Sequence, residues 1–240
     1  KTAIKLWKKL VSNNLVEYEC ALAQTYNNLG NIYNTTIRYV AAENYYKKAI
    51  AIKEKLYAVN PIRYGSDLAC TCNNLGGLYY YTNRHIQAEE YYKKALVIWK
   101  VLVKIVNQTV YENELACGYY NLGTLYHETD RYTEAEKVLK KAVVKREKMA
   151  EENPEAYAND LSRCYYGLGD LYRDIKRFSE AEEFLKKAVV IQENLVEEKP
   201  PAYDECLVNS YDSLGILYND TKRFSEAEVA FKKALKINKQ

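Results

Sequence analysis

The segment Leu29–Ala49 reads LGNIYNTTIRYVAAENYYKKA, and its pattern recurs along the whole chain. Its opening Leu-Gly pair returns at steps of 46, 47, 46 and 46 residues, at Leu75-Gly76, Leu122-Gly123, Leu168-Gly169 and Leu214-Gly215. A tyrosine follows each glycine by three residues, and alanines follow it by twelve and by nineteen. Self-similarity at a fixed period of this size indicates an array of stacked structural units.

The residues around each glycine predict a first helix in every repeat. In the first repeat one helical stripe comprises Leu22, Tyr26, Leu29, Gly30 and Tyr33. Apolar residues at this spacing mark the buried face of an amphipathic helix. A glycine inside a helix costs about 1 kcal/mol, so its recurrence indicates a contact between helices too close for a side chain.

A polar turn with an arginine separates this helix from a predicted second helix. Three repeats then carry the pattern of a capping box, a hydroxyl residue followed three residues later by glutamate: Thr133 with Glu136, Ser179 with Glu182, and Ser225 with Glu228. Val40 and Ile86 stand at the hydroxyl position in the first two repeats, so their second helices are expected to fray more readily, by about 1 kcal/mol. Pro61, Pro154 and Pro200 are expected to stop the helix before them.

The period assigns the whole chain to one array. Its predicted boundaries are residues 1–14 for the end of a preceding repeat, 15–60, 61–106, 107–153 and 154–199 for four repeats, and 200–240 for a fifth whose second helix is truncated. Because both ends then lack a neighbouring repeat, we expect them to expose apolar surface.

Composition narrows the class of protein. Apolar residues make up 48% of the chain, enough for a continuous core, and their longest runs are too short to span a bilayer. A formal charge of +3 gives no support for nucleic-acid binding, and the lysine pair of each second helix has glutamates beside it, which favours a solvated face with helical ion pairs. The six cysteines include no C-x-x-C pair, which favours buried thiols in a reducing, cytoplasmic environment over disulfides.

The motif L-G-x-x-Y, followed by A-x-x-x-F or its equivalent and a second alanine, resembles the tetratricopeptide repeat in every unit from Leu29 to Ala234. The resemblance implies an all-α fold, a right-handed superhelical solenoid of antiparallel helix pairs. The family period is about 34 residues, whereas the period here is 46 or 47, so the second helix is expected to run on. Such long units are similar to those of kinesin light chains and of bacterial repeat arrays.

The resemblance also implies that the first helices line a concave groove that binds a partner. The residues expected to face a peptide there are Asn27, Asn28, Asn31, Asn73, Asn74, Tyr80, Tyr120, Asn121, Arg163, Tyr166, Arg173 and Asp212. In peptide-binding members of the family, an asparagine two residues before the glycine holds the ligand backbone, and here Asn28, Asn74 and Asn121 form such a ladder. An amide both donates and accepts hydrogen bonds, which suits an extended chain. The alternative is that these amides cap or bridge neighbouring helices.

Two charged modes of binding are not expected. Some relatives clamp a terminal carboxylate with lysine and arginine, but Asn27, Cys117 and Asn121 stand at the positions where those residues would be needed. Arg163 and Arg173 can meet an acidic side chain, but Asp170 and Asp174 are close enough in sequence to neutralise them.

Catalysis has little support in the sequence. His85 and His127 are the only histidines, they lie in different repeats without a matching metal-ligand set, and no phosphate-binding glycine pattern is present. We expect no cofactor, no metal and no enzyme activity, and no nucleic acid or membrane as partner. The prediction is a scaffold that binds an extended peptide or a partner helix in the concave groove. The alternative is a structural array that associates end to end and binds no peptide.

Overall fold

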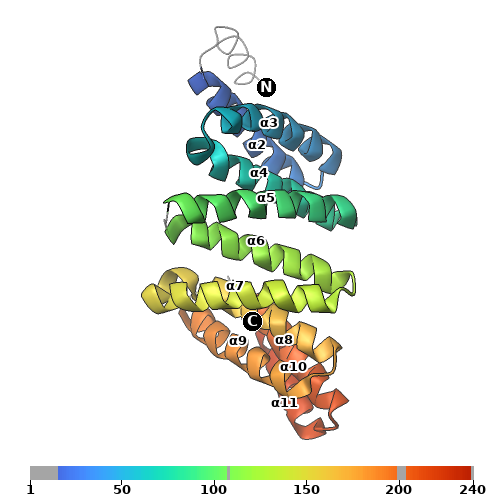
Figure 1. Ribbon diagram of the computed structural model, residues 1–240. Helices are drawn as coiled ribbons and strands as arrows, with labels where there is room; N and C mark the ends of the chain where they lie inside the picture. The colour runs from blue at the N-terminus through green and yellow to red at the C-terminus, as the bar shows by residue number, and fades with distance from the viewer. Residues whose placement is uncertain (1–15, 107–108, 199–203, 239–240) are drawn as a thin grey trace. The chain divides into compact units, whose positions relative to one another are not determined.

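The computed structural model describes residues 16–106, 109–198 and 204–238, and within them it forms ten helices and no strand (Figure 1). This confirms the all-α fold predicted from the period. The helices are α2 (Val16–Thr35), α3 (Tyr39–Val59), α4 (Pro61–Tyr81), α5 (His85–Val106), α6 (Thr109–Glu128), α7 (Tyr132–Glu152), α8 (Pro154–Asp174), α9 (Phe178–Glu198), α10 (Asp204–Asp220) and α11 (Phe224–Ile237). The predicted remnant at 1–14 and Pro200 lie outside the described residues.

The chain divides into two bodies, and the division falls inside α6. The N-terminal body is Lys1–Leu125 and the C-terminal body is Tyr126–Gln240. In the N-terminal body α2 contacts α3, α3 contacts α4 and α4 contacts α5, and α2 also contacts α4. In the C-terminal body α7 to α11 do the same, and α8 contacts α10. First helices of successive repeats therefore lie side by side within each body.

The predicted stripe of the first helix is buried. In α4, Leu68, Cys72, Leu75 and Tyr79 each expose 3% or less of their surface. The glycine in this stripe lies against the second helix of its own repeat, since a Cβ atom on Gly76 would fall 2.7 Å from the ring of Tyr92. The same closeness holds for Gly30 against Tyr46, Gly169 against Leu185, and Gly215 against Phe231. The prediction that these glycines mark close helix crossings is confirmed at these four positions.

The turn inside each repeat has the same structure in all five. One residue adopts a left-handed conformation with φ between 56° and 61°: Ile37, Asn83, Asp130, Lys176 and Lys222. The following arginine donates its backbone N–H to a tyrosine carbonyl five residues earlier, at 2.8 Å from Arg38 to Tyr33. This bond closes the first helix as a Schellman motif. The guanidinium of Arg38 then lies 4.4 Å from the centre of the Tyr33 ring, a cation–π contact that recurs in every repeat at 4.1–4.4 Å.

The capping boxes predicted at Thr133, Ser179 and Ser225 are wrong, because the second helices begin earlier. Helices α7 and α11 begin at Tyr132 and Phe224, and the arginine before each is an N-cap that makes no side-chain cap bond. The Schellman turn leads directly into the next helix, so the carbonyl of this arginine already accepts the first helical hydrogen bonds. The difference in fraying predicted from Val40 and Ile86 is wrong for the same reason, since neither occupies a cap position.

The first helices α4 and α8 have side-chain caps that the sequence analysis did not identify. Asn60 Oδ1 accepts the backbone N–H of Arg63 at 3.0 Å, and Asn153 Oδ1 accepts that of Ala156 at 3.2 Å. Proline follows each asparagine at the start of the helix, where its missing N–H is not needed. The predicted end of the preceding helices before Pro61 and Pro154 is confirmed.

Ile37 is the least suitable residue for its turn, which gives a stability prediction. A β-branched side chain in the left-handed region costs about 1–2 kcal/mol, and Ile37 is exposed, so little packing is lost on its removal. We expect Ile37→Gly to raise the melting temperature by about 3 °C in a thermal scan followed by circular dichroism. Asn83→Gly is the control and should change it less, because asparagine tolerates this conformation. A lower melting temperature for Ile37→Gly would contradict the turn geometry.

Ion pairs cover the second helices, as the sequence predicted. The first lysine of each Lys-Lys pair binds the glutamate four residues earlier: Lys47 with Glu43, Lys93 with Glu89, Lys140 with Glu136, Lys186 with Glu182, and Lys232 with Glu228. Three of these glutamates, the inter-repeat carboxylates Glu43, Glu136 and Glu182, also bind the next repeat. Each accepts hydrogen bonds from two side chains of the following repeat. These are the turn arginine, at 2.5–2.8 Å, and the hydroxyl of the tyrosine five residues before that arginine, at 2.9–3.3 Å.

These contacts change the acidity of the glutamates. Burial disfavours the charged form of Glu43, but the hydrogen bonds from Lys47, Arg84 and Tyr79 outweigh it and lower the pKa to about 2. For Glu182 the hydrogen bond from Arg223 is the largest influence and the pKa is again about 2. The inter-repeat carboxylates are therefore charged in the folded protein at neutral pH and connect successive repeats.

The state of the cysteines and the apolar character of the helices can be compared with the expectations from composition. All six cysteines are free thiols. Cys72 and Cys164 are buried, as predicted, whereas the other four are only half-buried: Cys20, Cys70, Cys117 and Cys206. Among the helices that the structure describes, none is both long enough and apolar enough to cross a bilayer.

Candidate functional site

Six of the twelve predicted site residues are asparagines on α2, α4 and α6 of the N-terminal body. We call them the amide wall: Asn27, Asn28, Asn31, Asn73, Asn74 and Asn121. Asn27 is 8% exposed and thus buried, whereas Asn28 and Asn31 are exposed, and Asn73, Asn74 and Asn121 are half-buried. None carries a charge, so this surface has hydrogen-bonding groups and no fixed electrostatic preference.

A hydrogen-bond network joins the amide wall across α2 and α4. Asn74 Nδ2 donates to Asn27 Oδ1 at 3.4 Å and to Asn31 Oδ1 at 3.3 Å. Asn31 Oδ1 also accepts from the hydroxyl of Tyr46 at 2.7 Å. Burial raises the pKa of Tyr46 to about 12, so this phenol stays protonated and remains a donor. The side chain of Asn31 is therefore fixed from behind by the second helix of its own repeat.

A second link joins α4 to α6. Asn121 Nδ2 donates to Asn73 Oδ1 at 3.0 Å and lies 3.8 Å from Cys117 Sγ. Bridging of neighbouring helices, which the sequence left open as the alternative, therefore occurs at Asn74 and Asn121. Asn28 differs from them, because its Oδ1 accepts only from Gln24 on the same helix at 2.9 Å.

The network leaves several amide groups with hydrogen-bonding capacity. Within the described residues, Asn74 Oδ1 and Asn121 Oδ1 accept no hydrogen bond, and Asn28 Nδ2 donates none. Two acceptors and one donor group thus remain on amides that their other bonds hold in place. A peptide backbone offers the complementary N–H and C=O groups.

Two predicted tyrosines lie on the same helices as the amide wall. The ring of Tyr80 on α4 is 5.4 Å from that of Tyr81 and 6.5 Å from that of His85, centre to centre. His85 is half-buried. Tyr120 on α6 is half-buried and immediately precedes Asn121. Aromatic area of this kind adds apolar contact beside the amides.

The predicted site residues of the C-terminal body differ in their exposure and in the contacts that their side chains make. Arg173 is occupied, with its guanidinium 2.6 Å from Asp170 and 3.0 Å from Asp174, and it donates to Ser213 Oγ at 3.1 Å. The predicted neutralisation is confirmed for Arg173. Arg163 is exposed and Asp212 is half-buried.

The structure also brings together residues that the sequence analysis kept apart. His127 Nε2 lies 2.8 Å from Asp174 Oδ2, and ligand atoms of His127, Asp170 and Asp174 all fall within 4.8 Å of one another. The prediction that no metal-ligand set accompanies His127 is therefore wrong. Arg173 already contacts both carboxylates, so a cation at this place would have to displace the guanidinium. Burial raises the pKa of Asp170, and the contact with Arg173 opposes that shift.

Comparisons with known proteins agree on the fold. Family models for the tetratricopeptide repeat match residues 114–194 in one case and 22–61, 69–105 and 207–240 in another. Among solved structures, BtubC (BKLC) from P. vanneervenii is similar with a TM-score of 0.77 and 19% identity, over 99% of this chain and 87% of that one. Repeats of a putative kinesin light chain from Podosopora anserina give 0.69 and 18%, over 92% and 95%.

A third similar structure is that of YrrB, with a TM-score of 0.55 and 18% identity, over 96% of this chain and 91% of that one. No curated protein sequence matches the chain. At these identities the solved structures support the helical repeat architecture alone. The resemblance to long kinesin-light-chain-like and bacterial repeats that the sequence predicted is confirmed.

Proposed function

Because this chain belongs to the tetratricopeptide repeat family, whose repeats form protein-interaction scaffolds, we propose that it binds an extended peptide along the amide wall. The observation that carries the proposal is the row of uncharged amides on three first helices, in which Asn74 and Asn121 bridge neighbouring helices and Asn28, Asn74 and Asn121 keep hydrogen-bonding capacity. Tetratricopeptide repeats are in general scaffolds without catalytic groups, in keeping with a binding role. YrrB, which shares the fold, has an unusual peptide-binding site.

The free groups of the amide wall suggest how the peptide is held. Asn74 and Asn121 offer their Oδ1 atoms to backbone N–H groups, and Asn28 offers its Nδ2 to a backbone carbonyl. Preorganised amides lose little side-chain entropy on binding, so each bond keeps more of its favourable free energy. The part of the ligand that lies on the amide wall is expected to show little preference for charge, because the wall itself carries none.

We propose that the predicted site residues of the C-terminal body contribute less to binding than the amide wall does. Arg163 is exposed and is proposed to meet an acidic side chain of the ligand, with Tyr166 and Asp212 on the neighbouring first-helix positions. Arg173 is proposed to position Asp170 and Asp174 rather than to contact the peptide, since both carboxylates already bind it.

The experiment uses a peptide selected from a displayed random library on the immobilised chain. We expect the Asn74→Ala, Asn121→Ala double variant to bind that peptide at least about fivefold more weakly by isothermal titration, because two hydrogen bonds of about 0.5–1.5 kcal/mol each are lost. Asn28→Ala, which disturbs only a contact with Gln24, should weaken it by about threefold.

Asn44→Ala is the matched control, since this asparagine is exposed on the second helix α3. It should bind as the parent chain does. Circular dichroism establishes that each variant is folded. Unchanged affinity in both the double variant and Asn28→Ala would remove the amide wall from the account.

The alternative function is self-association, and one observation favours it. Helix α11 exposes four large apolar side chains: Phe224, Val229, Phe231 and Leu235. Apolar surface gathered on one helix is typical of an interface. Sedimentation velocity over rising concentration separates the two functions. A strictly monomeric protein that binds peptide supports the proposal, whereas association without peptide binding supports the alternative.

A further inference from the structure

The fifteenth residue after each repeat glycine differs in size between repeats. It lies in the second helix and is Tyr45, Tyr91, Val138, Phe184 and Ala230 in successive repeats. Three of the five are aromatic, and the last is the smallest. Where the residue at this position is aromatic, its surroundings show which space the ring fills.

In the fourth repeat this space holds the ring of Phe184. Its centre is 5.8 Å from the centre of Tyr165 and 5.8 Å from that of Tyr172, so it lies between these two tyrosine rings of α8. The ammonium of Lys187 lies 5.0 Å from the centre of the Phe184 ring. Tyr45 in the first repeat has a similar place, 5.9 Å from Tyr26 and 5.3 Å from Tyr33.

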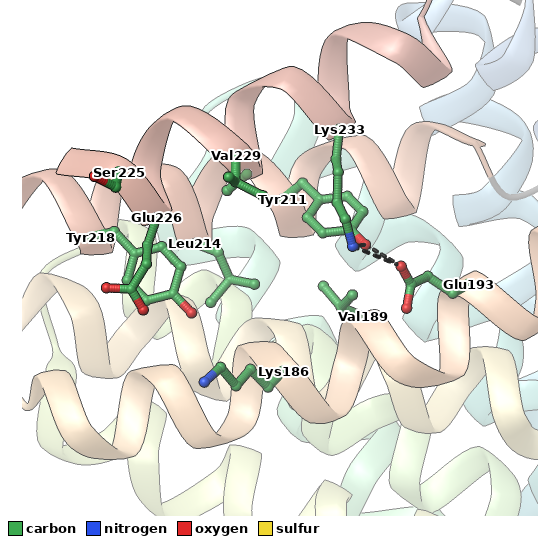
Figure 2. A pocket seen from close by; sticks show the side chains of 11 residues that line it. Lys186, Val189, Glu193, Tyr211, Leu214, Tyr218, Ser225, Glu226, Val229 and Lys233 are labelled. Atoms are coloured by element: carbon green, nitrogen blue, oxygen red, sulfur yellow. Dashed lines mark hydrogen bonds and ion pairs between the residues drawn. The ribbon is translucent and has the colours of Figure 1, made fainter. Parts of the chain in front are cut away.

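The fifth repeat keeps these surroundings but has only Ala230 at the position of the ring. A cavity of about 420 Å³ lies there between α9, α10 and α11, within the C-terminal body. Figure 2 shows Val189 of α9 opposite Leu214 and Tyr211 of α10, with Tyr218 at the other end of the cavity. Tyr211 and Tyr218 correspond by the repeat period to Tyr165 and Tyr172, so the two flanking rings remain in place.

A cation also remains in place at this cavity. Lys233, the counterpart of Lys187, has its ammonium 4.8 Å from the centre of the Tyr211 ring. Two neighbours hold this ammonium group in place. It donates to Tyr211 Oη at 2.8 Å and pairs with Glu193 at 3.3 Å, as Figure 2 shows. Tyr211 also hydrogen-bonds Glu193. The ammonium of Lys233 thus lies near the ring of Tyr211, as that of Lys187 lies near the ring of the corresponding Tyr165, at 5.7 Å.

We propose that this cavity is a binding site for one aromatic side chain of a partner polypeptide. Its volume lies in the range of about 300–1,000 Å³ that is usual for ligand sites. Two tyrosine rings and a lysine ammonium favour an aromatic ring over an aliphatic chain, because stacking and cation–π contacts add to apolar burial. The chain's own Phe184 shows that such surroundings accept a phenyl group.

This site is separate from the amide wall, which lies in the N-terminal body, so either proposal can fail without the other. The second helices α9 and α11 and one face of α10 form the cavity, whereas the wall belongs to first helices alone. A partner that engages both would bind by two independent contacts.

The test titrates the full chain with N-acetyl-phenylalanine amide and N-acetyl-tryptophan amide, followed by NMR shifts of residues around the cavity. N-acetyl-leucine amide is the control ligand. We expect the aromatic probes to bind with a dissociation constant of about 1 mM, and the leucine probe at least tenfold more weakly. Equal binding of leucine, or no shift at Tyr211 and Val189 with either aromatic probe, would overturn the proposal.

Two variants of opposite effect complete the test. Ala230→Phe supplies the missing ring from within the chain and should weaken the aromatic probes at least tenfold; Ala230→Leu serves in its place if that variant does not fold. Phe184→Ala should create a second site between Tyr165 and Tyr172 with the same preference. Asn74→Ala should leave probe binding unchanged.

One further outcome assigns the cavity to a different occupant. If the parent chain self-associates in sedimentation velocity and Ala230→Phe makes it monomeric, the cavity holds a side chain of a second copy, and the proposal is overturned. A monomeric parent chain together with probe binding that Ala230→Phe removes supports it.

Discussion

The Gly76→Ala variant is expected to unfold about 6 °C below the parent chain, a loss of about 2 kcal/mol. The new Cβ atom would lie 2.7 Å and 2.8 Å from two atoms of the Tyr92 ring, closer than carbon atoms approach in folded proteins. Tyr92 is 4% exposed and cannot move aside. Overpacking typically costs about 1–3 kcal/mol, and such short contacts with a buried ring place the cost at the upper end. Subtracting the gain of about 1 kcal/mol in helix propensity from glycine to alanine leaves the net loss of about 2 kcal/mol.

Gly77→Ala is the matched control, one residue further along the same helix. A Cβ atom there would meet only the Tyr92 hydroxyl oxygen, at 3.7 Å, an ordinary contact. We expect this variant to be unchanged or more stable by up to about 1 kcal/mol, since only the propensity term applies. Thermal scans of both variants decide the matter. Equal effects of the two substitutions would show that the close crossing at Gly76 is absent.

The Glu182→Gln variant is expected to lose about 2 kcal/mol of stability at pH 7. Glutamine keeps the shape of the side chain but removes the charge that binds Arg223 and Lys186, and hydrogen bonds to charged groups contribute about 1.5–3 kcal/mol each. We place the loss at the lower end because solvent reaches the glutamate and screens part of the interaction. Glu183→Gln is the control, because Glu183 makes one exposed pair with Lys187 and should change stability by about 0.5 kcal/mol or less.

The effect of Glu182→Gln should depend on pH in a defined direction. The pKa of Glu182 is lowered from an ordinary value of 4.5 to about 2 in the folded chain, so folding favours the charged form. Its contribution is fully present above pH 4.5 and is lost as the pH falls toward 2. Urea denaturation at pH 7, 5, 4 and 3 should therefore show the parent chain and the variant converging on acidification. A difference that stays constant over this range would contradict the lowered pKa.

The helix pairs could be predicted from the sequence because their signal is periodic and local. The stripe that includes Leu68 and Leu75 and the glycine at position 76 is set by helix geometry and by close packing within one repeat. Such constraints repeat with the period, so five copies reinforce one another in the sequence.

The start of the second helices, by contrast, was predicted wrongly from the sequence. Thr133 with Glu136 has the signature of a capping box, yet Glu136 pairs with Lys140 and Arg177. Glu134, which is at the third helical position, binds the Arg131 side chain at 2.7 Å. The start of the helix is fixed by the Schellman turn before it, and a residue such as Ile37 gives no sign in the sequence that it adopts positive φ.

The candidate sites could be predicted only in part, because they join different repeats. Asparagines at the position of Asn74 stand out in any one repeat, but the hydrogen bond from Asn121 to Asn73 depends on the offset between neighbouring helices. His127 and Asp174 meet for the same reason. The series that ends at Ala230 is visible in the sequence, but packing decides whether a small residue there leaves a cavity or lets its neighbours close it.

The most direct test of the account follows the side-chain amide signals of the ¹⁵N-labelled chain in an NMR titration with the selected peptide. The account predicts that the signals of Asn28, Asn74 and Asn121 shift together with one dissociation constant, while that of Asn44 on the second helix stays in place. Shifts confined to the second helices, with the three wall amides unmoved at saturation, would contradict it.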